Sequence, residues 1–115
     1  MIVGIGIDVC SLERLAAAGE RPGFLARVFN PEEIGLSELS RAGRFAAKEA
    51  LAKALGAPAG LRWLDCTITN DPDGRPLVHF DGTVKRRAEE LGVRTIHLSI
   101  SHDAGVAVAV AVLEA

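Results

Sequence analysis

The stretch that most constrains the fold is residues 44–56, with the sequence RFAAKEALAKALG. It is rich in Ala, Leu, Lys and Glu, which are strong helix formers, and it contains no proline and no internal glycine. Gly56 supplies a helix C-terminal cap, and the APAG sequence over residues 57–60 prevents continuation. Because alanines, leucines and Phe45 surround most of this helix, we expect it to be largely buried.

Two charged residues on this helix, Glu49 and Lys53, allow two interpretations. They are four residues apart in the favourable order, so they can form a salt bridge along the helix. A carboxylate on a buried helix needs a cation as partner, and a metal ion meets that need as well as a lysine does. In the second interpretation Glu49 is a metal ligand and Lys53 binds a phosphate in the same pocket.

Length and composition indicate one globular domain over residues 1–115. Hydrophobic residues make up 49% of the chain and the net charge is −2, which disfavours disorder, nucleic acid and membrane surfaces as explanations. Only two cysteines occur, Cys10 and Cys66, so neither a disulfide framework nor a zinc motif is expected. The chain shows no signal peptide and no apolar run long enough to span a bilayer, and we expect a cytoplasmic protein.

The first strand is expected over residues 2–9, where apolar residues alternate with glycines. We expect Val3, Ile5, Ile7 and Val9 to face the core. The glycine side leaves room for a helix or ligand to approach closely, and Asp8 stands at the end of that side.

The rest of the chain alternates turns with short periodic segments. Residues 24–29 can form a helix or a turn. The other expected elements are a helix capped by Ser11, a short helix from Asn30, strands over 63–70 and 75–80, a helix capped by Thr83, and strands over 95–101 and 106–112. This order predicts an α+β domain in which an antiparallel sheet packs against a long central helix.

The candidate chemistry rests on oxygen ligands. Asp8 and Glu49 lie on different elements, and the proposed ligand set contains only these carboxylates, without His or Cys. Such a set suits a hard ion such as Mg²⁺. Ser101, His102 and Asp103 resemble a hydrolase triad in composition only, because adjacency in sequence does not give triad geometry. The glycines at positions 4 and 6 lack the third glycine of a dinucleotide fingerprint.

Three segments together resemble one family, the holo-acyl-carrier-protein synthases of bacterial fatty-acid synthesis. They are residues 4–9 (GIGIDV), 44–56 and 98–103 (LSISHD), in the family's order and spacing. The resemblance implies the 4′-phosphopantetheinyl transferase fold and a Mg²⁺-dependent reaction. In that reaction coenzyme A donates 4′-phosphopantetheine to a serine of apo acyl carrier protein and 3′,5′-ADP leaves. It also implies a homotrimer with active sites between subunits.

The resemblance also implies roles for single residues. Asp8 and Glu49 match the metal-binding acids, and Lys53 matches the lysine near the coenzyme A phosphates, so Glu49 and Lys53 are the expected catalytic residues. His102 matches a histidine of the coenzyme site, contributed by the neighbouring subunit. The coenzyme site is expected to include Lys48 and Ser101 from the same motifs. Glu49, a metal-bound water and solvent all remain open as acceptors of the serine proton.

An acidic acyl carrier protein is the expected partner. Arg14 matches a docking arginine of the family, and Arg21 and Arg27 follow it within fourteen positions. A local basic patch is therefore expected although the net charge of the chain is negative. The alternative is that these arginines are simply solvated.

Two other functions compete with this reading. A metal-dependent nucleotide pyrophosphohydrolase would explain Asp8, Glu49 and Lys53 but not the arginines. A non-catalytic assembly subunit would have no use for a costly buried acid. One departure from the family is a short connection between Phe29 and Arg44, so the shape of residues 30–43 is left open.

Overall fold

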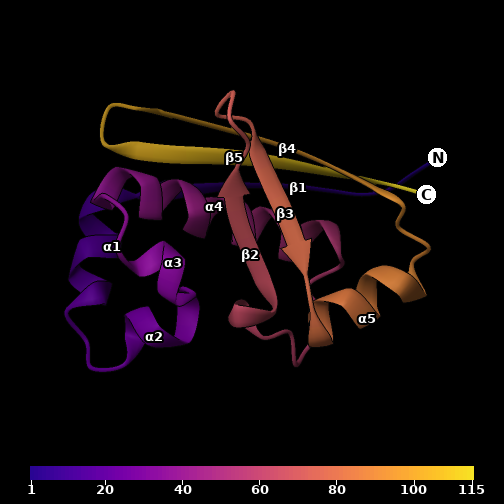
Figure 1. The fold of residues 1–115 in the computed structure, drawn as a ribbon, viewed down its shortest axis with the longest axis horizontal. Helices are drawn as coiled ribbons and strands as arrows, with labels where there is room; N and C mark the ends of the chain where they lie inside the picture. The colour runs from indigo at the N-terminus through magenta and orange to yellow at the C-terminus, as the bar shows by residue number, and fades with distance from the viewer.

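One long helix lying across an antiparallel sheet organises the computed structural model, which describes residues 1–115 (Figure 1). The elements in chain order are β1 (Ile2–Ser11), α1 (Leu12–Gly19), α2 (Phe24–Val28), α3 (Pro31–Ile34), α4 (Glu38–Ala54), a 3₁₀ helix (Trp63–Asp65), β2 (Cys66–Asn70), β3 (Pro76–Phe80), α5 (Gly82–Glu90), β4 (Thr95–Asp103) and β5 (Val106–Glu114). The predicted α+β class with a central helix is confirmed.

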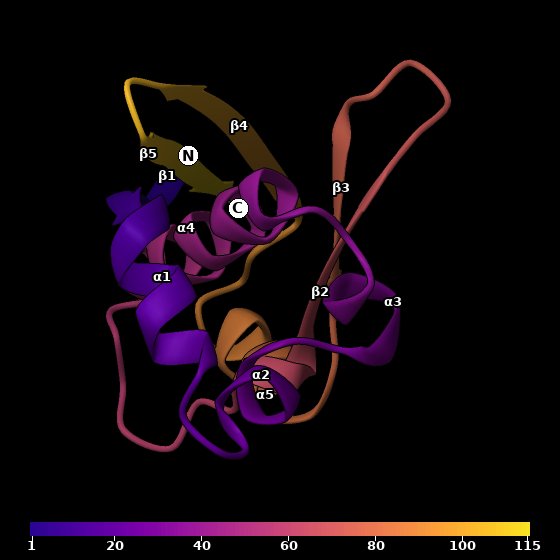
Figure 2. The same ribbon diagram turned by 90° about the vertical axis from the view of Figure 1, so that its left-hand side faces the viewer.

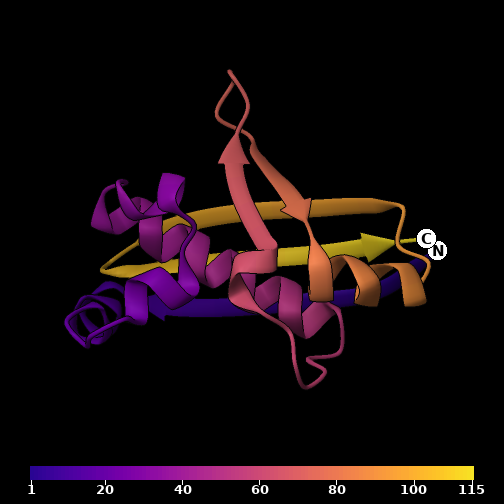
Figure 3. The same cartoon turned by 60° about the horizontal axis from the view of Figure 1, so that its bottom comes forward.

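The main sheet has three antiparallel strands in the order β1–β5–β4, and the helices lie on one side of it (Figure 2). The central strand β5 turns Ala107, Ala109 and Ala111 toward α4, and all three are fully buried. Small side chains on this face let the helix sit close to the sheet. The two chain ends meet at one end of the sheet, where the Met1 ammonium donates to the Ala115 carbonyl at 3.2 Å (Figure 3).

The glycine side of β1 is the side that meets α4, as predicted. A Cβ atom on Gly4 would lie 1.9 Å from the Ala54 carbonyl oxygen, and one on Gly6 would lie 1.9 Å from that of Ala50. No side chain fits between two backbones at this separation, so glycine is required at both positions.

The opposite face of β1 was expected to be the core, and that expectation is wrong. The side chains of Ile5, Ile7 and Val9 are 67%, 60% and 60% exposed, respectively. Alternation along a strand shows that two faces differ, but it does not show which face a helix will cover. Here the helix selects the face that can be approached most closely.

Helix α4 begins at Glu38, earlier than the sequence predicted. Ser37 caps it by accepting a hydrogen bond from the backbone N–H of Ser40 at 3.2 Å. Gly43 lies inside the helix, and a Cβ there would come within 3.2 Å of Ile100 on β4. The other end agrees with the prediction, because Gly56 follows the last turn with φ +87°.

The second sheet is the β2–β3 hairpin, which is not hydrogen-bonded to the main sheet; its strand β3 lies beside β4, and β2 contacts α4 (Figure 2). The expected strand over residues 63–70 is shorter, because Trp63–Asp65 forms a 3₁₀ helix. Thr83 was expected to cap the following helix and does not. Instead the Asp65 carboxylate accepts hydrogen bonds from the Thr83 N–H at 2.8 Å and its hydroxyl at 2.6 Å. No helix of the structure is both long and apolar enough to cross a membrane.

Candidate active site

Asp8, Glu49 and Lys53 meet where β1 crosses α4. The Lys53 ammonium donates to Asp8 Oδ1 at 3.1 Å and to the Ile7 carbonyl at 2.9 Å. Glu49 and Lys53 do not form the salt bridge along the helix that was the first of the two interpretations, because Lys53 pairs with Asp8 instead. The close β1–α4 packing at Gly4 and Gly6 brings the end of the strand beside the helix.

Asp8, Glu49 and Lys53 together carry two carboxylates and only one ammonium. Burial raises the pKa of Glu49, the charge of Asp8 raises it further, and Lys53 lowers it in part. The thiol of Cys10 responds in the same way, since burial and the two carboxylates raise its pKa to about 11. One lysine therefore does not fully compensate two neighbouring carboxylates.

The donor set fits Mg²⁺. Two carboxylates converge, and no further His, Cys, Asp or Glu completes a cluster of three. Mg²⁺ is typically bound by one or two carboxylates, with phosphate oxygens and waters in its other positions. A second cation beside Asp8 and Glu49 would also relieve the repulsion that raises the pKa of Glu49.

These three residues line an open hollow of about 460 Å³, which we call the site hollow. Arg14 and Arg21 also line it, so the structure brings two of the three predicted docking arginines to the acids. Arg27 is not among the lining residues and lies in the last turn of α2.

Apolar side chains for which the sequence predicted no role in the site line much of the rest of the site hollow. Phe24 and Phe45 are the largest of them, with ring centroids 6.3 Å apart. The Arg21 guanidinium lies over the Phe24 ring at 5.5 Å from its centroid. Phe45 lies three residues before the Lys48–Glu49 pair of the motif, but its apolar character indicated only that the helix is buried.

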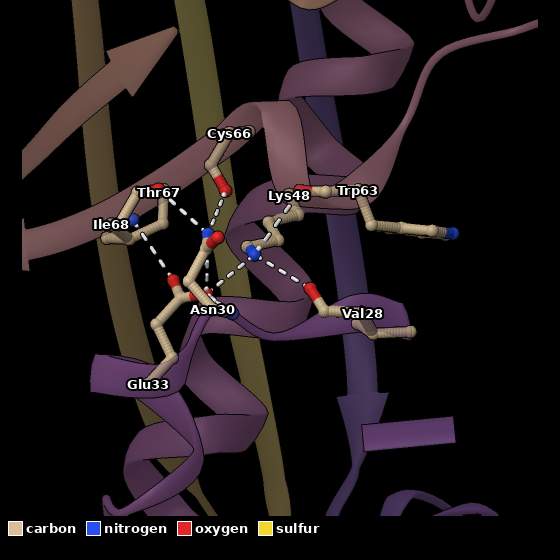
Figure 4. A network of polar contacts seen from close by, with 8 residues as sticks. All are labelled: Val28, Asn30, Glu33, Lys48, Trp63, Cys66, Thr67 and Ile68. Atoms are coloured by element: carbon tan, nitrogen blue, oxygen red, sulfur yellow. Dashed lines mark hydrogen bonds and ion pairs between the residues drawn. The ribbon is translucent and has the colours of Figure 1, made fainter. Parts of the chain in front are cut away.

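Lys48 does not lie in this group, and its predicted role at the coenzyme is withdrawn. Its ammonium is buried, and it donates to Glu33 Oε1 at 2.7 Å and to the Val28 carbonyl at 2.8 Å (Figure 4). The Lys48 and Glu33 side chains are each 1% exposed. An ammonium already bound in this way is not free for a phosphate.

Ser101 and His102 are exposed near the end of β4 and do not line the site hollow. They pair in register with Val108 and Ala107 on β5, which separates them from β1 in the same sheet. Ser101, His102 and Asp103 form no hydrogen bonds with one another, so no hydrolase triad is present. Within one chain these residues stay apart from Asp8.

Two carboxylates and a lysine in an open hollow of an α+β domain can bind a metal ion and a phosphate group together. A model of the 4′-phosphopantetheinyl transferase superfamily matches residues 4–111. A holo-[acyl-carrier-protein] synthase of Beutenbergia cavernae is 55% identical over 115 residues, covering 99% of each chain. The chain belongs to the 4′-phosphopantetheinyl transferase superfamily.

Solved structures agree with this assignment. The crystal structure of a Helicobacter pylori holo-[acyl-carrier-protein] synthase, in complex with coenzyme A, matches with a TM-score of 0.84 and 38% identity. That match covers 96% of this chain and 99% of the other. The synthase from Neisseria meningitidis matches with a TM-score of 0.86 and 33% identity, covering 100% of both chains.

Proposed function

We propose that this protein transfers 4′-phosphopantetheine from coenzyme A to a serine hydroxyl of apo acyl carrier protein and releases 3′,5′-ADP. The observation that carries the proposal is the meeting of Asp8, Glu49 and Lys53 in the site hollow. Relatives named holo-[acyl-carrier-protein] synthase over the full chain support it, as does the relative solved with coenzyme A.

In the proposed reaction the serine oxygen gives up its proton and attacks the phosphorus that bears pantetheine, and the bond from that phosphorus to the ADP oxygen breaks. Such transfers need positioning and charge neutralisation more than covalent help. Asp8 and Glu49 would hold Mg²⁺, which supplies charge neutralisation at the pyrophosphate. The Lys53 side chain is 50% exposed, so its ammonium has room to leave Asp8 for a phosphate oxygen.

Arg14 and Arg21 are the proposed docking residues for the acidic carrier protein. Both line the site hollow, so a carrier held there would present its serine toward the acids. Arg27 is proposed as an outer member of the same patch, since it follows on α2. Attraction of this kind acts mainly on the rate of encounter.

We also propose a cytoplasmic homotrimer with active sites shared between subunits. The open face of the main sheet carries Ile5, Ile7 and Val9 beside the outward valines of β5, with which they pair in register. An apolar sheet face of this kind is typical of an interaction surface. A neighbouring chain packed there could bring Ser101 and His102 to the site hollow. Cys10 and Cys66 are free thiols, which suits a reducing compartment.

Intact mass spectrometry of apo acyl carrier protein, incubated with coenzyme A, Mg²⁺ and this protein, tests the proposal. A gain of one phosphopantetheine on the carrier is the expected result. Unchanged carrier mass with coenzyme A consumed would favour the nucleotide pyrophosphohydrolase. Unchanged carrier and coenzyme would favour the non-catalytic assembly subunit.

A further inference from the structure

A buried ion pair between Lys48 and Glu33 ties α4, which lines the site hollow, to α3, and the proposed chemistry does not use this pair (Figure 4). Glu33 lies on α3, and Lys48 lies on α4 directly before Glu49. The two charged atoms are 2.7 Å apart. Desolvation offsets the attraction within a buried pair, so the pair adds little net stability, whereas the loss of one partner alone is strongly destabilising.

Backbone groups of α2, of β2 and of the link between α2 and α3 complete the network. Glu33 Oε1 accepts from the Asn30 N–H at 2.8 Å, and Glu33 Oε2 accepts from the Ile68 N–H on β2 at 3.1 Å. Lys48 donates to the carbonyl of Val28, the last residue of α2, at 2.8 Å. Both carboxylate oxygens therefore have donors, and α2, α3 and β2 are tied to one residue of α4.

The side chain of Asn30 extends the network. Its amide nitrogen donates to Thr67 Oγ1 at 2.8 Å and to the Cys66 carbonyl at 3.3 Å, which fixes the link between α2 and α3 against β2. The aromatic cluster lies against the same anchor. Lys48 lies over the Phe29 ring at 5.6 Å from its centroid, and Phe29 is 6.4 Å from Phe45 between centroids.

The network holds the residues of the site hollow that lie at α2, whereas Asp8 is held by another element. Arg21 and Phe24, which line the hollow, stand just before and at the start of α2, whose far end Lys48 holds. Asp8 is set instead by β1, which packs on α4 through its glycines and pairs with β5. The two groups of residues thus have separate anchors on the same helix.

We infer that Lys48 and Glu33 are positioning residues that hold Arg21 and Phe24, the carrier-binding residues at α2, in place relative to Asp8 and Glu49 in the site hollow. The inference rests on the proposed function. It assigns the pair to recognition of the carrier protein and not to coenzyme A or to the metal.

The test compares two variants that weaken the Lys48–Glu33 network with a control variant that weakens a contact at the C-terminal end of α4. Asn30→Ala removes the side-chain hydrogen bonds to β2 and the one to Glu33 Oε1, and it keeps the ion pair itself. The double variant Lys48→Met/Glu33→Gln removes both charges together, which avoids the buried unpaired charge of either single change. Arg87→Met is the control, because it too removes a cation that donates to a backbone carbonyl, that of Leu55 at 2.9 Å. Arg87 does not line the site hollow.

Steady-state kinetics with each substrate varied in turn give the first readout. We expect Asn30→Ala and the double variant to raise the KM for the carrier protein by roughly 2- to 30-fold, the range for residues that act through a network. The KM for coenzyme A and kcat at saturating carrier should stay at wild-type values. Arg87→Met should leave the carrier KM unchanged. An equal rise in both KM values, a loss confined to kcat, or an unchanged carrier KM overturns the inference.

Trp63, the single tryptophan, gives a second readout that needs no activity. Its carbonyl accepts from Lys48 at 3.4 Å, and its ring stacks on Phe45 with centroids 5.4 Å apart. Acrylamide should quench its fluorescence more in the double variant than in the wild type or in Arg87→Met. Unchanged quenching contradicts the anchoring role. A wild-type protein that leaves the carrier unmodified contradicts the proposed function, whatever the fluorescence shows.

Discussion

Replacing Gly6 with alanine should separate β1 from α4 and displace the residue on which the site depends. The new Cβ would lie 1.9 Å from the Ala50 carbonyl oxygen and 2.9 Å from the Ala54 nitrogen. Ordinary contact begins at 3.4 Å, so strand and helix must move apart by about 1.5 Å, the difference between 3.4 and 1.9. Neither neighbour can swing away, since both are backbone atoms.

The cost follows from that displacement. Overpacked sites lose about 1–3 kcal/mol, and a clash between two backbones belongs at the upper end of that range. A loss of about 3 kcal/mol corresponds to a fall in melting temperature of roughly 10 to 15 °C for a domain of this size. Asp8 follows two residues later, and a misplacement of about 1 Å at a reacting centre can cost roughly 100-fold in rate.

Thermal unfolding and the carrier mass assay measure the two effects. Gly35→Ala is the matched control, because a Cβ there meets nothing within 4 Å and the backbone φ is −74°, which alanine adopts freely. The control should keep wild-type stability and activity. A Gly6→Ala protein with the wild-type melting temperature and full kcat would refute the close-packing argument.

Three further outcomes are expected. Glu49→Gln should keep the fold and lose transfer, because the amide keeps the shape and drops the charge that binds the metal; near-normal activity without added Mg²⁺ would show that Glu49 is not a ligand. Arg14→Glu should raise the KM for the carrier far more than that for coenzyme A, with a smaller effect at high salt in kinetics at two ionic strengths. An equal effect on both substrates would place Arg14 in the coenzyme pocket. Mixing inactive Glu49→Ala and His102→Ala proteins under subunit exchange should restore part of the activity, and no recovery in well-mixed hybrids would mean that each chain builds its own site.

Local signals predicted much of the fold. The central helix, its end at Gly56 and the cap at Ser11 depend on neighbouring residues, and the structure has all three. The start of α4 was missed because Gly43 disfavours a helix by propensity, whereas in the structure it permits close packing against β4. Propensity cannot register a contact with a strand far along the chain.

The site was predictable only in part. Asp8 and Glu49 stand at the end of a strand and on a helix, and their chemistry suggested a shared ion before their positions were known. Lys48 misled, because its partner Glu33 lies on another helix and the sequence does not show which of two neighbouring lysines is buried. The face of β1 that is exposed was predicted wrongly for a similar reason. Both faces of the strand lack charged residues over most of its length, so the sequence does not show which face is covered.

The strand order of the main sheet has a consequence for how the protein is made. Of the five strands, β1 is the first to leave the ribosome, yet the only strand it pairs with is β5, the last of the five. Contacts so distant in sequence form slowly, because a long loop must close before they stabilise anything. The nascent chain therefore carries Asp8 on an unpaired strand until β5 emerges. A protein released early, without its final strand, would have both β1 and β4 left as open edges, which invite aggregation.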